Sequence, residues 1–438
     1  MRFLAAWLVA LPLCAQAPVP LSLKKAVEIA LAPEGSARIA LAQEATKQAE
    51  QRVKQAHSAF LPTIDGAISE RDQTTNLKSF GLNFQLPFAG FSFPSLAGPF
   101  AVFDARFSAQ QSVLDFTILR RYQASKASLE AVKLEIGAAQ TAIADQVAKA
   151  YAAALRADAA LEAVRANVQL SEALVKLADQ QKTAGSGTGI EVTRAQVQLA
   201  NDRQRLIKAE NDRRSTVLQL MRIIGLGMES EVQLTDKLKF EPLEINSLTA
   251  AVDSAKKMRA DLKVQQQKEE ASRVGVSAVK AERLPSVAAF GDYGSNGPAI
   301  NESRATRSVG VAVKIPLFDG GRRDSRKEEA SSQFRQEQIR TRDLQRQVEL
   351  DVRLAWDSVR STQAQVDTAR EGLALAENEL AQARRRYEAG VTNSIEVTDA
   401  QTRLDRARDN QVAALYSYNV ARIDLSTAMG TIGEYVNQ

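Results

Sequence analysis

Two carboxylates in the C-terminal half are spaced so that their side chains could act together. Glu396 and Asp399 lie in the stretch YEAGVTNSIEVTDAQTRL, which begins at Tyr387. Side chains three positions apart share one face of a helix, so these two would form an acidic patch. Crowded carboxylates raise each other's pKa and attract cations. The alternative is that they are ordinary solvated charges beside a helix end, which is the usual role of such residues.

Other patterns give little support for catalysis or metal binding. The chain has one histidine, His57, and one cysteine, Cys14, so no His/Cys cluster has the spacing of metal ligands. The glycine-rich run GSGTG at Gly185 follows a helical segment and lacks the Lys-Ser/Thr of a phosphate-binding loop. We therefore expect neither an enzyme nor a metal or cofactor site.

The acidic stretch has an earlier copy in the chain. The segment KTAGSGTGIEVTRAQVQL aligns with it at an offset of 205 residues (396 − 191 = 205). This offset pairs Glu191 with Glu396 and Arg194 with Asp399. Such self-similarity indicates an internal duplication, with a cationic and an anionic version of one position.

The composition favours long helices over nucleic-acid binding. Aromatic residues make up 5% and charged residues 25% of the 438 positions, and Ala, Gln, Glu, Arg and Leu dominate long stretches. This mixture is typical of coiled coils. The net charge of +5 is small for the length, and both signs are interleaved, so we expect no nucleic-acid partner.

The first residues have the pattern of a secretory signal peptide. Arg2 precedes an apolar run, and small residues follow it. We expect cleavage after Ala15, which assigns residues 1–15 to the signal peptide. Cys14 is a candidate for lipidation, but Leu13 stands where lipoproteins carry a small residue, so lipidation is the weaker interpretation. No later run has the ~20 apolar residues of a membrane-spanning helix.

Each half is expected to begin with a helical segment and to continue with a β-hairpin. The first helix covers roughly residues 23–60 and ends before Pro62, and its counterpart ends before Pro285. Apolar and polar residues alternate strictly in AVFDARFSAQ and in RSVGVAVKIPL, which predicts strands with one apolar face. Weaker segments before them complete β-hairpins at about 63–113 and 286–317, about four strands in all.

These strands have two possible settings. Four alternating strands suit a membrane barrel, which needs a lipid-facing apolar side and no open edges. A closed barrel takes about eight strands or more, so several copies would have to share one. The alternative is a small soluble sheet packed on helices. The Phe-rich segment 80–103 suggests either an aromatic girdle at the membrane surface or an apolar loop tucked onto the helices.

A long helix follows each β-hairpin. Residues 117–184 contain no proline, and their apolar residues recur at steps of three and four. At 1.5 Å per residue, ~65 residues make a helix about 100 Å long. Both long helices end at an Ala-Gly pair, Ala184-Gly185 and Ala389-Gly390, whose glycine can adopt a left-handed cap.

The predicted layout is therefore a duplication. The first repeat covers 16–230 and the second 231–438, and each holds a helix, a β-hairpin, a long helix, a tip and a return helix. The tips lie at about 184–190 and 389–395, and a new helix starts a few residues after each.

This order of elements resembles the TolC family of outer-membrane efflux proteins. The likeness covers nearly all of the mature chain and rests on the signal peptide, the two similar halves and the tip RRYEAGVTNSIEVTDAQTRL with its weaker copy. The resemblance implies a mainly α-helical protein with a β-barrel part. A homotrimer with four strands per chain would share one twelve-stranded transmembrane barrel, and its helices would form a long α-helical barrel across the periplasm with coiled-coil tips.

The resemblance also implies roles for tip residues. Glu396 and Asp399 would form carboxylate rings at the periplasmic constriction, where they attract cations and repel anions. Tyr387 and Glu191 would make hydrogen bonds that hold the closed state. Because Arg194 replaces the acidic residue in the first copy, the second helical hairpin would line the closed pore and the first would brace it.

Two further expectations concern the tips. Some family members carry an arginine just after the tip glycine, but Thr392 stands there in this chain, so Arg384 to Arg386 are the candidates to replace that lock. The turn residues, both of each Ala-Gly pair, would dock a periplasmic adaptor: Ala184, Gly185, Ala389 and Gly390.

The function implied by the resemblance is that of the outer-membrane channel in a tripartite efflux or type I secretion system. It would passively conduct substrates from an inner-membrane pump and be gated at the tips. Its partners would be two further copies of itself, the adaptor, the pump and outer-membrane lipid. The alternative is an exported coiled-coil scaffold or periplasmic adaptor without a pore, which would leave the two β-hairpins unexplained.

Overall fold

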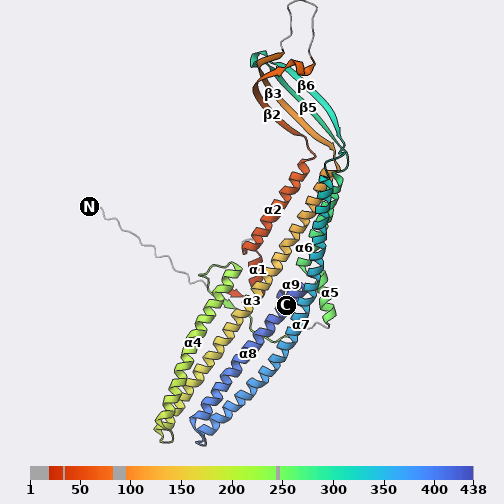
Figure 1. Cartoon of the computed structure of the whole chain (residues 1–438). Helices are drawn as coiled ribbons and strands as arrows, with labels where there is room; N and C mark the ends of the chain where they lie inside the picture. The colour runs from red at the N-terminus through yellow and green to blue at the C-terminus, as the bar shows by residue number, and fades with distance from the viewer. Residues whose placement is uncertain (1–18, 33–34, 82–94, 243–246, 438) are drawn as a thin grey trace, which may run out of the picture. The chain divides into compact units, whose positions relative to one another are not determined.

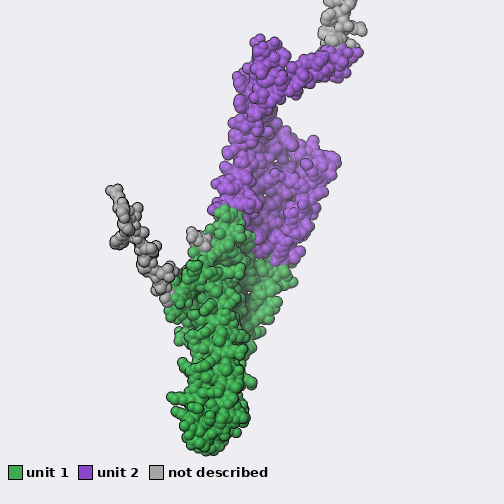
Figure 2. Space-filling view, turned by 90° about the vertical axis from the view of Figure 1, so that its left-hand side faces the viewer, with its two compact units in different colours: residues 1–45, 133–264, 341–438 green, residues 46–132, 265–340 purple. Residues whose placement is uncertain are grey.

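A computed structural model describes residues 19–32, 35–81, 95–242 and 247–437. The predicted signal peptide with Cys14, and residues 82–94 of the Phe-rich segment, lie outside these ranges. The chain divides into two compact units, coloured separately in Figure 2. Unit 1 comprises residues 1–45, 133–264 and 341–438, and unit 2 comprises residues 46–132 and 265–340.

Unit 2 contains a four-stranded antiparallel sheet with the order β2-β3-β5-β6 (Figure 1). The strands are β2 (Thr63–Asn76), β3 (Leu96–Leu114), β5 (Ser286–Gly297) and β6 (Arg304–Lys314). They occupy both regions predicted to form β-hairpins, and β3 extends beyond both ends of AVFDARFSAQ. Within the described ranges, the edge strands β2 and β6 each pair on one side only.

The two faces of this sheet differ sharply in polarity. One face carries apolar side chains that are between 67% and 87% exposed: Ile64, Ile68, Phe107, Val309 and Val311. The register places these side chains on the same side of the sheet. On the other face, the Arg106 guanidinium lies 2.8 Å from Asp104 and 3.0 Å from Asp292, and all three are half-buried. The sheet thus exposes its apolar face and pairs charges on its polar face.

Four helices begin in one unit and end in the other. They are α2 (Ala37–Ser58), α3 (Phe116–Thr183), α6 (Ala260–Ala281) and α7 (Arg322–Glu388). The two longest, α3 with 68 residues and α7 with 67, follow the two β-hairpins as predicted. None of the helices in the described ranges combines the length and the apolar character that crossing a bilayer requires.

Two short 3-10 helices, Leu77–Phe80 and Ile300–Glu302, lie in unit 2, and the remaining α-helices and β-strands belong to unit 1. They are β1 (Val19–Leu21), α1 (Leu23–Leu31), α4 (Gly189–Ile224), β4 (Val232–Leu234), α5 (Leu248–Met258), α8 (Ser394–Met429) and α9 (Ile432–Asn437). The parallel pairing of β1 with β4 was not predicted, so the expectation of about four strands was too low. Three-residue strands carry too little alternation to be seen in a sequence.

The single helix predicted for roughly residues 23–60 is wrong, because two helices form there. α1 ends at Leu31, and Ala32 is extended, with φ −61° and ψ 151°. The ring of Pro33 disfavours a helical conformation in the residue before it, which explains the break. The second half has a similar break between α5 and α6 at Arg259, with φ −57° and ψ 123°.

The helices of unit 1 bury three apolar clusters. One surrounds Tyr151 and Leu220, and a second surrounds Val352 and Tyr418. The third lies near the tips and joins α3, α7 and α8 through the following side chains: Leu174, Ala376, Leu380, Ala383, Tyr387, Val397, Ala400 and Leu404. This third cluster holds the two helical hairpins together where the candidate site lies.

Candidate functional site

Unit 1 contains two helical hairpins, each closed by a short tip (Figure 1). The first consists of α3 and α4, and the second of α7 and α8. Gly185 and Gly390 have φ of 76° and 69°, in the left-handed region that glycine adopts most readily. The amide N–H groups of Ser186 and Val391 bond back to carbonyl oxygens five residues earlier, at 3.0 and 2.9 Å. The backbone of the two tips is therefore nearly the same.

The side chains of the first tip cap their own helix. Thr188 is the N-cap of α4 and forms a capping box with Glu191. The backbone N–H of Thr188 donates to the Glu191 carboxylate at 2.8 Å, which satisfies a donor at the helix start. Glu191 therefore serves the local turn.

The second tip uses the equivalent glutamate differently. Asn393 is the N-cap of α8, and its side chain accepts from the Ile395 backbone N–H at 3.1 Å. The Glu396 carboxylate accepts from the Thr392 hydroxyl and lies 3.4 Å from the Arg386 guanidinium. Of the three arginines considered as a lock, Arg386 is the one that contacts this carboxylate.

The structure does not bring the remaining predicted charges together. Asp399 and Arg194 are both exposed, one on α8 and the other on α4. Glu396 is half-exposed and is tied to Thr392 and Arg386, not to Asp399. Within the described ranges, no three His, Cys, Asp or Glu side chains are grouped so that they could hold a metal ion.

Tyr387 joins the hairpins through its backbone and its ring. It is 5% exposed, and its carbonyl oxygen accepts from the Gln181 side chain at 3.2 Å. Its hydroxyl makes no hydrogen bond with any described residue, and neither does the hydroxyl of Ser394. The Tyr387 hydroxyl is therefore not bonded directly to Glu191. Burial, followed by the charge of Glu191, raises the pKa of Tyr387.

A small cavity explains how these hydroxyls are accommodated. Tyr387, Ser394 and Glu191 all line a space of about 20 Å³ between the two hairpins. One water needs roughly 10–15 Å³ measured in this way, together with two to four polar partners. The cavity therefore has the size and lining that one bridging water requires.

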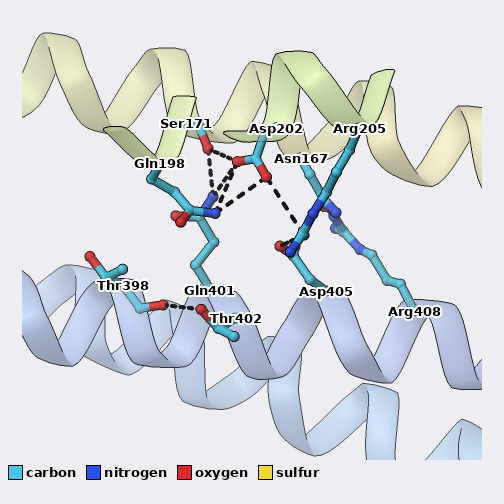
Figure 3. A network of polar contacts seen from close by, with 10 residues as sticks. All are labelled: Asn167, Ser171, Gln198, Asp202, Arg205, Thr398, Gln401, Thr402, Asp405 and Arg408. Atoms are coloured by element: carbon cyan, nitrogen blue, oxygen red, sulfur yellow. Dashed lines mark hydrogen bonds and ion pairs between the residues drawn. The ribbon is translucent and has the colours of Figure 1, made fainter. Parts of the chain in front are cut away.

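A second polar contact between the hairpins lies farther from the tips (Figure 3). Ser171 of α3, Asp202 of α4 and Gln401 of α8 are each 1% exposed. The Ser171 hydroxyl donates to Asp202, and the Gln401 amide donates to the Ser171 oxygen at 2.6 Å and to Asp202 at 3.4 Å. Gln198 adds a bond to Asp202 at 3.2 Å. The Asp202 carboxylate is thus buried and surrounded by donors.

Asp405 is a second buried carboxylate in this region. It is 4% exposed, and one of its oxygens lies 3.3 Å from the Arg205 guanidinium, which is also 3.7 Å from Asp202. Its other oxygen, Oδ1, has no hydrogen-bond partner among the described residues. Burial, followed by the negative charge of Asp202, raises the pKa of Asp405 to about 6.

This pair of carboxylates was not predicted, although the sequence contains a signal for one of them. Val397, Ala400, Leu404 and Asp405 follow steps of three, four and one, so they lie on one buried stripe of α8. A carboxylate on an apolar stripe is unusual, because a buried charge needs compensation. Its partner on α4 could not be identified without the packing of the two hairpins.

Comparison with known proteins identifies the family. A family model described as "Outer membrane efflux protein" matches residues 29–226 and 251–431. The chain belongs to the outer membrane efflux protein family. The match confirms the resemblance to TolC and, together with the names of its relatives, the predicted location in the outer membrane.

Relatives of this efflux protein are distant in sequence but similar in fold. The outer membrane protein TolC of Vibrio cholerae is 26% identical over 310 residues, which cover 68% of this chain and 70% of that protein. The alkaline protease secretion protein AprF of Pseudomonas aeruginosa is 22% identical over 333 residues, or 75% and 69% of the two chains. The crystal structure of the outer membrane protein VceC from Vibrio cholerae has a TM-score of 0.74 at 20% identity and covers 93% of this chain and 96% of that one. The fold is therefore that of the TolC-like channels.

Proposed function

We propose that this protein is the outer-membrane channel of an efflux or secretion system and that three copies form it. The observation that carries the proposal is the sheet of unit 2, which exposes an apolar face, pairs charges on its other face and leaves two edges open. In a bilayer, an open edge would expose unpaired backbone N–H and C=O groups, each of which costs several kcal/mol. A stable sheet in lipid must therefore close.

Closure requires more than one chain. Four strands per chain are too few for a barrel, whereas three chains supply twelve, above the minimum of about eight. In that arrangement β6 of one copy pairs with β2 of the next. The exposed valines of β6, Val309 and Val311, face lipid, and the Arg106 ion pairs face the lumen. The number three comes from the family and not from the geometry.

The helical hairpins of unit 1 complete the channel. Three copies of α3, α4, α7 and α8 form a helical barrel in the periplasm, and the tips gate it. Glu396 and Asp399 place negative charge at the narrow end, while Arg194 stays on the outer, bracing hairpin. Gly185 and Gly390 shape the turns that receive a periplasmic adaptor, together with Ala184 and Ala389. An inner-membrane pump delivers the substrate, so the channel itself performs no catalysis.

Export and duplication complete the proposal. Residues 1–15 direct the chain across the inner membrane and are removed, and Cys14 is removed with them. The repeats 16–230 and 231–438 descend from one ancestral unit, in agreement with the two helical hairpins. The names of the relatives include protease secretion and pyoverdine export, which supports a role in export without specifying the cargo.

Fractionation of cell envelopes tests the proposal. The detergent-extracted particle should come from the outer membrane and have a mass near three times the 47.7 kDa chain, less its signal peptides. A monomer in the soluble periplasmic fraction would instead support a scaffold without a pore.

A matched pair of variants tests the orientation of the sheet. Val309→Asp places a charge on the apolar face and should impair outer-membrane assembly, because a lipid-facing Arg or Lys costs up to about 2–4 kcal/mol and an Asp somewhat less. Ser308→Asp is its neighbour on the opposite face and should assemble normally. Equal assembly of the two variants would contradict a lipid-facing valine stripe.

A further inference from the structure

The two helical hairpins are joined by a polar contact that the proposed gate does not use. Asp405 of α8 is ion-paired to Arg205 of α4, and Gln401 of α8 reaches Ser171 of α3 (Figure 3). Asp405 and Gln401 are 4% and 1% exposed. Separation of the second hairpin from the first would break both contacts.

The two carboxylates in this contact, Asp202 and Asp405, differ in the number of groups that bond to them. Asp202 accepts hydrogen bonds from three side chains, those of Ser171, Gln198 and Gln401. Asp405 has the Arg205 ion pair on one oxygen, and its Oδ1 is buried without a partner in the described ranges. Because one guanidinium serves both carboxylates, a proton is most easily taken up by the less supported one.

Other charges around Asp405 leave this imbalance in place. On α8, Arg408 lowers its pKa and Asp409 raises it. On α3, the neutral side chains of Ser171 and Asn167 take part in the contact, and Asn167 accepts from Arg408. On α7, Glu379 is paired with Arg403 of α8. On α4, Asp202 and Arg205 oppose each other in sign.

We propose that Asp405, with Asp202 beside it, is a proton-binding site that couples the packing of the two helical hairpins to pH. With a proton bound, Asp405 no longer repels Asp202, and its O–H becomes a donor within the contact. Without the proton, two buried anions share Arg205. The site thus favours packed hairpins in acid and loosens them near neutrality.

The direction of this pH dependence follows from the linkage between proton binding and the packing of the hairpins. The pKa of Asp405 is raised from 3.8 to about 6 in the packed state, so this state binds more protons than a separated one between these values. Packing is therefore strongest at low pH and weakens as pH rises through about 6. A shift of about two units limits the change in the packing equilibrium to about a hundredfold. A consequence for opening rests on the proposed function of the tips as a gate.

Hydrogen exchange of the purified full-length protein tests the site. Asp405→Asn mimics the protonated side chain, and comparison with the wild type at the same pH cancels the chemical exchange rate. At pH 7.5, amides of residues 401–408 should exchange up to about a hundredfold more slowly in the variant, since the pKa shift of about two units corresponds to a factor of about a hundred. At pH 5 this difference should be about ten times smaller, because the penalty for an unprotonated Asp405 in the packed state falls as the pH approaches 3.8. The same difference at both pH values would indicate a merely structural role and overturn the proposal.

Infrared titration provides a second readout. The wild type should lose a buried carboxylic acid band with a midpoint near pH 6, and Asp405→Asn should lack that band. Asp202→Asn, which removes the neighbouring charge, should lower the midpoint but leave it above the ordinary value of 3.8, because burial remains the larger cause of the shift. Asp212→Asn, an exposed carboxylate on α4, should leave it unchanged. A wild type without this band at pH 5 would overturn the proposal.

Conductance separates this proposal from the proposed function. If the band and the exchange difference are present but single-channel opening does not depend on pH, the proton site stands and the gating role of the tips fails. If opening varies with pH but survives unchanged in Asp405→Asn, a different group is responsible and the proton site is not the switch.

Discussion

At the first tip, Glu191 bonds to the backbone of its own helix cap, whereas at the second tip Glu396 bonds to Thr392 and Arg386. The turns beneath these residues are nearly the same, with φ of 76° at Gly185 and 69° at Gly390. A left-handed turn has one good chemical solution, glycine, while a helix start can be capped in several ways. The two hairpins therefore share the backbone of their turns while the side chains beside them differ.

The largest effect on stability should come from the turn glycines, which the two tips share. Gly185→Ala and Gly390→Ala should each destabilise the protein by about 1–2 kcal/mol, the cost of a left-handed conformation for a residue with a Cβ. Among the described residues other than the chain neighbours of each glycine, no atom lies within 4 Å of either added Cβ, so the cost is conformational and not steric.

A third glycine is the control for this comparison. Gly137 lies inside α3 with equally open surroundings, and Gly137→Ala should stabilise the protein by about 0.5–1 kcal/mol. Denaturant unfolding of the three variants measures these differences. A large gap between Gly185→Ala and Gly390→Ala would show that the two turns are not equivalent.

The next largest effect on stability should come from the two glutamates, which bond differently at the two tips. Glu191→Ala removes half of a capping box and should cost about 1 kcal/mol of stability. Glu396→Ala removes a half-exposed ion pair and should cost only about 0.2–1 kcal/mol. Thermal unfolding of the pair measures the difference, and 1 M salt should reduce only the cost of Glu396→Ala. Equal salt dependence would break the contrast.

The smallest effect is expected at Tyr387. Its buried hydroxyl bonds directly to no described residue and faces only a cavity with room for about one water, so Tyr387→Phe should change the free energy of unfolding by less than about 0.5 kcal/mol. Tyr151 is the matched control, because its hydroxyl donates at 2.7 Å to Asp236, and Tyr151→Phe should cost about 1.5–3 kcal/mol. A comparable loss in the two variants would mean that a tightly held water completes the bonding of Tyr387.

The sequence predicted elements whose signal is local. The alternation of Val309, Val311 and Val313 marked β6, and each Ala-Gly pair marked the end of a long helix. The break between α1 and α2 was missed, although Pro33 stands there, because the apolar pattern continues on both sides of it.

Contacts between distant segments could not be predicted in this way. Val19 pairs with Val232, and Asp405 contacts Arg205, across separations that no periodicity reveals. Among the site residues, spacing located Glu396 and Asp399 on one helix, but it could not show that Glu396 turns toward Arg386. Helix packing decides these contacts, and one sequence carries no record of which helices meet.

Single-channel recording across a planar lipid bilayer tests the central claim most directly. The purified outer-membrane particle should give discrete conductance steps. Asp399→Ala should raise the conductance and weaken block by multivalent cations, while Arg194→Ala on the bracing hairpin should leave both unchanged. A particle of trimer mass that inserts into the bilayer and passes no current would contradict the claim that this protein is a channel.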